Sequence, residues 1–130
     1  MQVANTFDTD KLHDLLSKTG KLAIEKMAFG AIELDAAGTI LSYNKAEGDI
    51  TGRDPKGQIG KRFFDEVAPC TKHPDFHGRF QQLVSGTIPN AKFDFVFDYQ
   101  MRPTKVQILM SKSLVKKNGA HTYWVFVKRI

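Results

Sequence analysis

Polar and apolar residues alternate with a period of two in "KFDFVFDYQM", residues 92–101. Positions 93, 95, 97 and 99 are aromatic, whereas positions 92, 94 and 98 are charged. This period predicts a strand with one buried face. Two further strand-like runs follow, "TKVQILMSKSLV" (104–115) and "TYWVFVK" (122–128), with the turn signal "KNG" between them. The last third of the chain is therefore predicted to form three strands.

The first half of the chain predicts two more strands and several short helices. The runs "FGAIEL" (29–34) and "TILSYN" (39–44) read as strands joined by the hairpin loop "DAAG". Residues 44–60 hold four glycines and one proline, so short helical turns and loops are expected there. In "HPDFHGRFQQLVSG" (73–86), Phe76, Phe80, Leu83 and Val84 share one helical face, and Gly86 ends the helix.

Near the N-terminus, residues 9–18 place Leu12, Leu15 and Leu16 at helical spacing, with Gly20 as a stop. The order of elements predicts an α+β fold, in which a five-stranded antiparallel sheet carries helices on one face and an N-terminal helical cap. A pocket is expected between the sheet and the helical section.

Composition narrows the possible functions. The 130 residues fit one domain, and the single cysteine excludes an internal disulfide. The net charge of +5 is spread without a dense basic run, so we expect no nucleic-acid partner. No apolar run approaches the roughly 20 residues of a membrane span, so no membrane is expected. No signal peptide is evident, which favours the cytoplasm.

Cys70 lies in "APCTKHP", close to two prolines. A free cysteine is often only a small buried apolar residue. The alternative is a reactive thiolate paired with His73, as in nucleophilic catalysis, but no third, orienting group is evident. The four histidines are dispersed, so no metal site is predicted. We therefore expect no enzymatic activity, and a cysteine-dependent enzyme remains only an alternative.

Tyr43 ends a predicted strand and Glu47 follows four residues later. If the segment between them is helical, the two side chains lie on one side and can meet. Spacing alone favours a half-buried tyrosine and a surface carboxylate, because glutamate is almost never fully buried.

Several segments together resemble a known family. "AIELDAAGTILSYNKAEGDITGRDPKGQIGKRFFDEVAPC" is similar to a PAS domain. More narrowly, "YNKAEGDITGRDP", "FFDEVAPCT", "FDYQMRPTKV" and "YWVFVKR" resemble the photoactive yellow protein family of bacterial blue-light receptors. Four separated segments match in order, from about Phe29 to the C-terminus.

The resemblance implies a cofactor, 4-hydroxycinnamic acid (p-coumaric acid), held as a thioester on Cys70. Tyr43 and Glu47 match the two hydrogen-bond donors to its phenolate, and Glu47 can donate only if it is protonated. Thr51 matches the residue that orients the tyrosine, and Arg53 matches the arginine that covers the pocket. The pocket walls implied by the resemblance are Ile32, Phe63, Val67, Ala68, Pro69, Thr71, Phe97, Tyr99 and Met101.

The same resemblance implies a photocycle. Light isomerises the cofactor from trans to cis, Glu47 gives its proton to the phenolate, and the N-terminal cap loosens as the signal. Met101 is expected near the reset step. The family link divides the chain into a cap, 1–28, and a PAS core, 29–130, within one domain. A monomer that signals to a downstream protein is expected.

Phe95 and Arg102 depart from the best-known member, which has tyrosine and threonine there. They leave the colour and the recovery rate open. Two alternatives keep the fold but not this cofactor. One is a PAS module that binds another ligand or a protein partner, and the other is a pocket engineered to bind a fluorogen.

Overall fold

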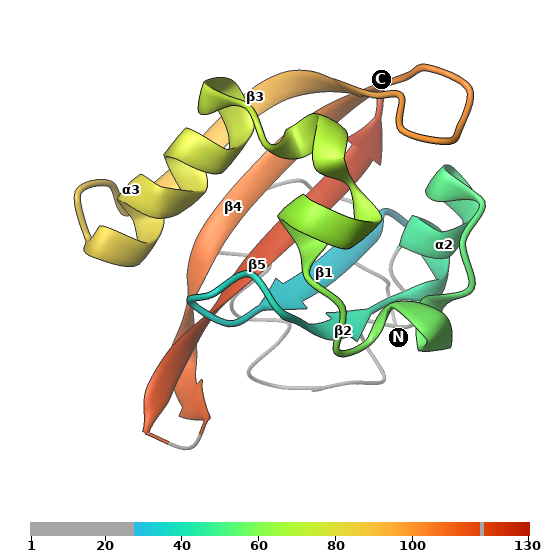
Figure 1. The fold of residues 1–130 in the computed structure, drawn as a ribbon. Helices are drawn as coiled ribbons and strands as arrows, with labels where there is room; N and C mark the ends of the chain where they lie inside the picture. The colour runs from blue at the N-terminus through green and yellow to red at the C-terminus, as the bar shows by residue number, and fades with distance from the viewer. Residues whose placement is uncertain (1–27, 118) are drawn as a thin grey trace.

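The structure, a computed structural model, describes residues 28–117 and 119–130. The helix expected over residues 9–18 lies outside the described residues. Five antiparallel strands form one sheet in the order β2-β1-β5-β4-β3 (Figure 1). Their bounds are β1 Gly30–Leu34, β2 Ile40–Tyr43, β3 Asn90–Phe97, β4 Thr104–Lys117 and β5 Ala120–Arg129. The predicted α+β fold with a five-stranded antiparallel sheet is thus confirmed.

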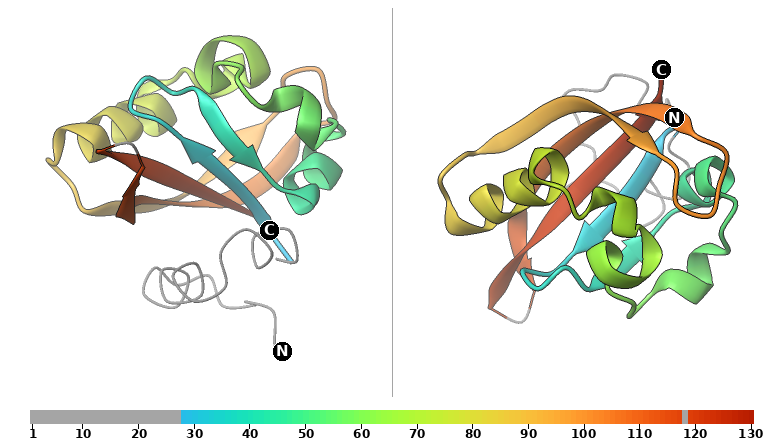
Figure 2. Two further views of the ribbon diagram at one scale, coloured as in Figure 1. Left: turned by 90° about the horizontal axis from the view of Figure 1, so that it is seen from below. Right: turned by 45° about the horizontal axis from the view of Figure 1, so that its top comes forward.

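The helical section between β2 and β3 is a series of short turns: α2 Lys45–Thr51, η1 Pro55–Gln58, η2 Phe63–Val67, η3 Pro69–Thr71, η4 Pro74–Gly78 and α3 Arg79–Ser85. All of them lie on one face of the sheet, which we call the inner face (Figure 2). The segments η2 and η4 are single π-helical turns, which the hydrophobic pattern did not distinguish from α-helix.

Aromatic side chains join the helical section to the inner face. Phe76 is fully buried and contacts Phe93, Phe95 and Phe97 of β3, with ring centroids 5.4, 5.2 and 6.4 Å away. The alternation in β3 therefore produces the predicted buried face, on which the aromatic side chains point toward the helices. As predicted, α3 ends at Gly86, whose φ of 83° suits a residue without a side chain.

The strand predicted over 92–101 is shorter than expected. β3 ends at Phe97, so Tyr99 and Met101 belong to the loop that leads to β4. Gln100 has a φ of 51°, a left-handed conformation that a strand cannot contain, and Pro103 lacks the N–H needed for strand pairing. The loop turns back over the end of the sheet, and this turn places Tyr99 and Met101 at the candidate site.

The opposite, outer face of the sheet is strongly apolar near β5. Trp124 and Phe126 stack with ring centroids 5.9 Å apart, and Leu109 of β4 lies opposite Phe126. All three side chains are buried. None of the described helices lies on this face (Figure 2).

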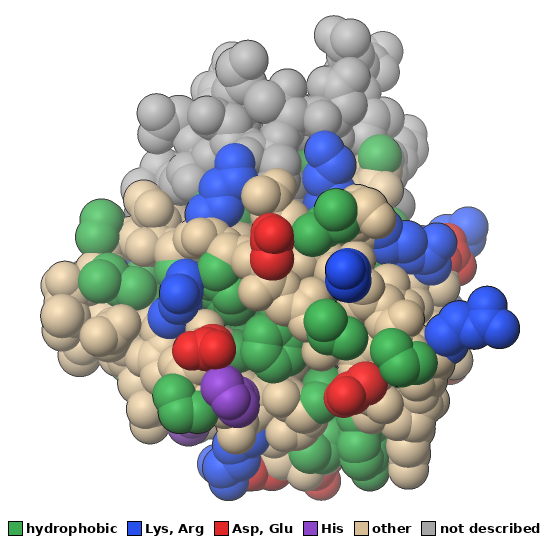
Figure 3. All heavy atoms as spheres, turned by 90° about the horizontal axis from the view of Figure 1, so that it is seen from above, with side chains coloured by type: hydrophobic (Ala, Val, Ile, Leu, Met, Phe, Trp, Pro, Cys, Tyr) green, Lys and Arg blue, Asp and Glu red, His purple; other side chains and the backbone are tan. Residues whose placement is uncertain are grey.

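The surface of the described residues offers few further clues. On the face shown in Figure 3, Lys and Arg side chains are dispersed rather than gathered into a single patch. None of the helices in the described part of the chain is long and apolar enough to cross a membrane.

Candidate functional site

A narrow cavity lies between the helical section and the end of the sheet. Its water-accessible volume is only about 10 Å³. Its walls come from segments far apart in the sequence: Tyr43, Glu47, Thr51, Arg53, Phe63, Val67, Ala68, Cys70, Phe97, Tyr99 and Met101.

All of these residues belong to the set named from the sequence. Three members of that set do not line the cavity in this structure. Ile32 is fully buried in β1, opposite Tyr43 in the strand register. Pro69 and Thr71 flank Cys70 in η3, and the Thr71 hydroxyl donates to Ala68 O at 2.6 Å, which secures the turn. All three residues therefore lie next to lining residues, Ile32 beside Tyr43 and the other two beside Cys70.

The polar end of the cavity is built on α2. The Tyr43 hydroxyl lies 2.8 Å from Thr51 Oγ1, which in turn donates to Glu47 O at 2.9 Å. Because the single Thr51 hydroxyl proton is used in that second bond, Tyr43 donates to Thr51 here. The one-sided arrangement expected of Tyr43 and Glu47 is present, although Tyr43 precedes the helix rather than lying within it.

Glu47 is the most unusual group in the cavity. Its side chain is 1% exposed, and Oε1 is buried without a hydrogen-bond partner among the described residues. Burial raises the pKa of this carboxyl from 4.5 to about 8, although the cationic Arg53 and Arg129 act in the opposite direction. Glu47 is therefore mainly protonated at neutral pH. The surface carboxylate favoured by spacing alone is wrong, because the fold takes Glu47 inside.

Tyr43 is also held in its neutral form. Burial and the nearby Glu47 raise the pKa of the Tyr43 hydroxyl well above its usual value, and the hydrogen bond with Thr51 and the charge of Arg53 only partly offset this. The cavity thus presents two protonated oxygen groups side by side. Such a pair can donate two hydrogen bonds to an acceptor placed between them.

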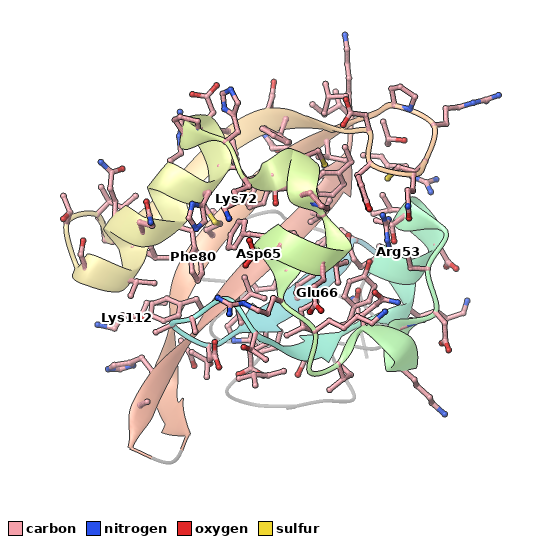
Figure 4. The ribbon with its side chains drawn as sticks, viewed as in Figure 1. Arg53, Asp65, Glu66, Lys72, Phe80 and Lys112 are labelled. Carbon is pink, nitrogen blue, oxygen red and sulfur yellow. The ribbon has the colours of Figure 1, made fainter. Side chains whose placement is uncertain are left out.

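Arg53 closes the cavity on the solvent side. It follows α2 and reaches the loop after β3, where Nη2 donates to Tyr99 O at 2.9 Å (Figure 4). Its Nη1 donates to Thr51 O at 3.3 Å and lies 3.9 Å from Met101 Sδ. The guanidinium group therefore joins the two segments that cover the opening.

Cys70, in η3, also lines the cavity and is partly exposed. His73, the partner that a catalytic thiol would need, does not line the cavity. Its Nδ1 accepts a hydrogen bond from Asp75 N at 3.1 Å and lies 3.7 Å from the Asp75 carboxylate. The Cys70–His73 pair suggested by the sequence is thus not assembled. Among the described residues, no cluster of side chains suited to a metal ion occurs.

Sequence reasoning missed Asn44, which holds the polar end in place. Its Oδ1 accepts from Glu47 N at 3.0 Å and from Ala31 N at 2.9 Å, and its Nδ2 donates to Phe29 O at 3.1 Å. The signal was available, because Asn at an N-cap with Glu three residues later is typical of a helix start. Here the Glu47 carboxyl faces the cavity, since the Asn44 N–H donates to Ala31 O instead.

Two roomier hollows lie on the surface near His77, between the β1–β2 turn and the segments η2 to α3. Their polar side chains are exposed or half-buried, and in one of them Asp65 is paired with Arg62 and Lys72. Figure 4 shows Asp65 and Lys72 side by side. Neither hollow contains a buried titratable group among the described residues, so the narrow cavity is the better candidate.

Known proteins resemble this chain in sequence and in fold. The PAS fold family matches residues 19–130. Photoactive yellow protein from Halochromatium salexigens is 49% identical over 95% of this chain and 96% of its own length, and that from Rhodothalassium salexigens is 47% identical over the same shares. The photoactive yellow protein domain of the sensor histidine kinase Ppr from Rhodospirillum centenum superposes with a TM-score of 0.79. It has 41% identity, and the match covers 89% of this chain and 98% of that one.

The family model and the named relatives place this fold among the sensory PAS domains of the photoreceptor class, which is not a catalytic class. Within that class, the chain belongs to the photoactive yellow protein family.

Proposed function

We propose that this protein is a blue-light receptor that carries 4-hydroxycinnamic acid as a thioester on Cys70. The observation that carries the proposal is Glu47, a buried carboxyl whose Oε1 has no partner among the described residues, in the same cavity as Tyr43 and the only cysteine. An elongated acid attached at Cys70 would reach toward the two donors at the polar end. When bound, this group supplies visible absorption and trans–cis isomerisation of its double bond.

Attachment requires only the thiol and an activated form of the acid. The Cys70 sulfur attacks the carbonyl carbon, the leaving group departs with its electron pair, and the thiol proton passes to solvent. The partial exposure of Cys70 supports access of such a reagent. Because the cavity is narrow, Arg53 and Met101 at its mouth must move aside for the aromatic ring to enter.

Tyr43 and Glu47 would stabilise the phenolate end of the bound group. A buried anion costs several kcal/mol unless strong hydrogen bonds offset it. Tyr43 would turn its proton from Thr51 to the phenolate, and the Thr51 hydroxyl would continue to hold the helix through Glu47 O. Glu47 would donate its acidic proton, and the positive charge of Arg53 would favour the anion further.

After illumination, Glu47 would give its proton to the displaced phenolate oxygen. The new Glu47 carboxylate would then lie fully buried, a charge that the surrounding protein must rearrange to solvate. Met101 would assist the thermal reset, and its position in the cavity lining supports this role.

The output would be a loosening of the N-terminal cap, residues 1–28, from the PAS core, residues 29–130, within one domain. The apolar side chains of Trp124, Phe126 and Leu109 on the outer face support this, because a cap that detaches needs an apolar surface to dock on. A downstream signalling protein would detect the loosened cap. The related domain from Rhodospirillum centenum belongs to a sensor histidine kinase, which is consistent with an output of this kind.

The direct test is reconstitution of the purified protein with an activated ester of 4-hydroxycinnamic acid. We expect a visible absorption band that survives denaturation and gel electrophoresis, and that bleaches and recovers after a blue flash. A protein that stays colourless would contradict the proposal and favour a PAS module that uses a different ligand. A pigment that forms but does not bleach would contradict the photocycle.

A further inference from the structure

Gly30 is in unusually close contact with Glu47. It is the first residue of β1 and is buried. A Cβ atom placed on Gly30 would overlap Glu47 Oε1 and would lie 3.1 Å from both Cβ and Cδ of the same side chain. The Glu47 carboxyl therefore rests directly against the bare backbone of the strand.

Backbone conformation does not explain this glycine. Gly30 is absent from the residues with positive φ, in contrast to Gly38, Gly52 and Gly60. A glycine inside a strand weakens the strand and commonly marks a close approach of another group. Here the approaching group is the Glu47 carboxyl.

Hydrogen bonds fix β1 and the start of α2 in place, so neither element can shift easily to make room for a side chain at position 30. Gly30 pairs with Val127 of β5, on one side of an interior strand. Asn44 bonds to the backbone of Phe29 and Ala31, on either side of Gly30, and also to Glu47 N. The remaining freedom lies in the Glu47 side chain, whose open direction is the cavity.

We propose that Gly30 is a positioning residue, whose missing side chain lets the Glu47 carboxyl rest against β1 and so fixes its distance from Tyr43 and from a ligand oxygen in the cavity. The part that concerns the ligand rests on the function proposed above. The part that concerns the carboxyl applies to the unliganded protein as well. A methyl group at position 30 would displace the carboxyl toward the cavity.

The test uses Gly30→Ala with Gly57→Ala as the matched control. An added Cβ at Gly57 meets nothing closer than 3.9 Å, and Gly57 is exposed and has no positive φ. The readout is the infrared C=O stretch of the protonated Glu47, isolated as the difference between each unliganded protein and the same protein with Glu47→Gln. We expect the band to shift in Gly30→Ala and to stay in place in Gly57→Ala. An unshifted band in Gly30→Ala would overturn the proposal.

A stability cycle provides a second readout if Gly30→Ala folds poorly. Glu47→Ala removes Cδ and Oε1, two of the three Glu47 atoms that the added methyl would meet, and leaves only Cβ. We expect Gly30→Ala to lower the urea concentration at the unfolding midpoint when it is introduced into the parent protein. The same substitution introduced into the Glu47→Ala variant should lower the midpoint clearly less. Rescue of folding by Glu47→Ala counts as support. An equal loss in both backgrounds, or failure of the double variant to fold, would show that the methyl acts on the strand and not through Glu47, which overturns the proposal.

Reconstitution with the activated acid then separates this inference from the proposed function. We expect the absorption maximum of Gly30→Ala to differ from that of the parent, and that of Gly57→Ala to match it. If neither the parent nor Gly57→Ala forms pigment, the proposed function fails, while the infrared and urea results still decide the role of Gly30. If the pigments of Gly30→Ala and the parent have the same absorption maximum, the link from Gly30 to the ligand is overturned.

Discussion

Two buried glutamates lie on opposite faces of the sheet, and their surroundings differ. Glu33 in β1 faces outward and Glu47 in α2 faces the cavity, and each is 1% exposed. Glu33 accepts hydrogen bonds from Ser42 Oγ at 3.0 Å and from Thr122 Oγ1 at 2.6 Å. Glu47 Oε1, equally buried, has no partner among the described residues, and burial raises the pKa of this carboxyl to about 8.

The difference shows that burial of a carboxyl does not by itself indicate a functional site. A buried polar group is normally satisfied by hydrogen bonds, and Glu33 is an ordinary example on a structural face. A group left unsatisfied is costly to the fold and needs another explanation. At Glu47 the explanation that we propose is a ligand oxygen, bound in the cavity that Tyr43, Thr51 and Cys70 also line.

The largest expected effect concerns the thiol. Cys70→Ser should abolish covalent pigment, because a serine hydroxyl is far less acidic than a thiol and takes up the acyl group poorly. The measurement is visible absorbance of the denatured protein after incubation with the activated acid. Thr71→Ser, one residue away, is the matched control and should retain pigment. Covalent colour in Cys70→Ser would refute attachment at this residue.

The next effect separates the two glutamates directly. Glu47→Gln should keep the pigment but shift its absorption maximum to the red, because an amide donates a weaker hydrogen bond to the phenolate. It also has no proton to give up, so the light-induced structural change should shrink. Glu33→Gln, the isosteric control on the other face, should change neither property. Equal spectra for the two variants would mean that the cavity glutamate has no special role.

The contrast should also appear in the pH dependence of stability. The folded-state pKa of Glu47, about 8, lies above its unfolded value of 4.5, so the folded protein binds the extra proton between these pH values. The free energy of unfolding of the unliganded protein should therefore fall as pH rises from about 5 to about 8, by up to about 1.4 kcal/mol per pH unit.

Urea unfolding at several pH values measures this slope. Glu47→Gln should lose the part of the pH dependence of the unfolding free energy that Glu47 causes. Glu33→Gln should retain that part. If Glu47→Gln keeps the parent's slope, the carboxyl is not buried in protonated form.

The fold was largely predictable from the sequence, because short-range patterns determine most of it. The aromatic alternation of Phe93, Phe95 and Phe97 identified β3 and its inner face. Its end was misplaced, because the left-handed Gln100 is a turn that alternation does not reveal. The π-helical turns of η2 and η4 were likewise missed, since their apolar spacing over five residues differs little from that of an α-helix.

The site was less predictable from residues alone. The spacing of Tyr43 and Glu47 permitted a contact but favoured an exposed carboxylate, because burial depends on how α2 packs against β1. Only the resemblance to a family brought Cys70, Arg53 and Met101 together with them. The contributions of Asn44 and Gly30 depend on contacts across the strand–helix junction, which no local pattern describes.

The smallest effect tests the second donor of the cavity. Tyr43→Phe should raise the pH at which the dark pigment bleaches, because the phenolate loses one hydrogen bond and its protonation becomes easier. A single hydrogen bond to a charged group, about 1.5–3 kcal/mol, corresponds to a shift of roughly one to two pH units. A spectroscopic titration of both proteins in the dark gives the midpoints. An equal or lower midpoint in Tyr43→Phe would refute the hydrogen-bond pair.

The central claim is that Glu47 is the proton donor of the cavity, and light-minus-dark infrared difference spectroscopy of the reconstituted protein tests it most directly. The account predicts a protonated-carboxyl C=O band that disappears on illumination, with a new carboxylate band in its place. Both bands should be absent from Glu47→Gln and unchanged in Glu33→Gln. A carboxyl signal that persists in Glu47→Gln, or one that is lost in Glu33→Gln, would contradict the account.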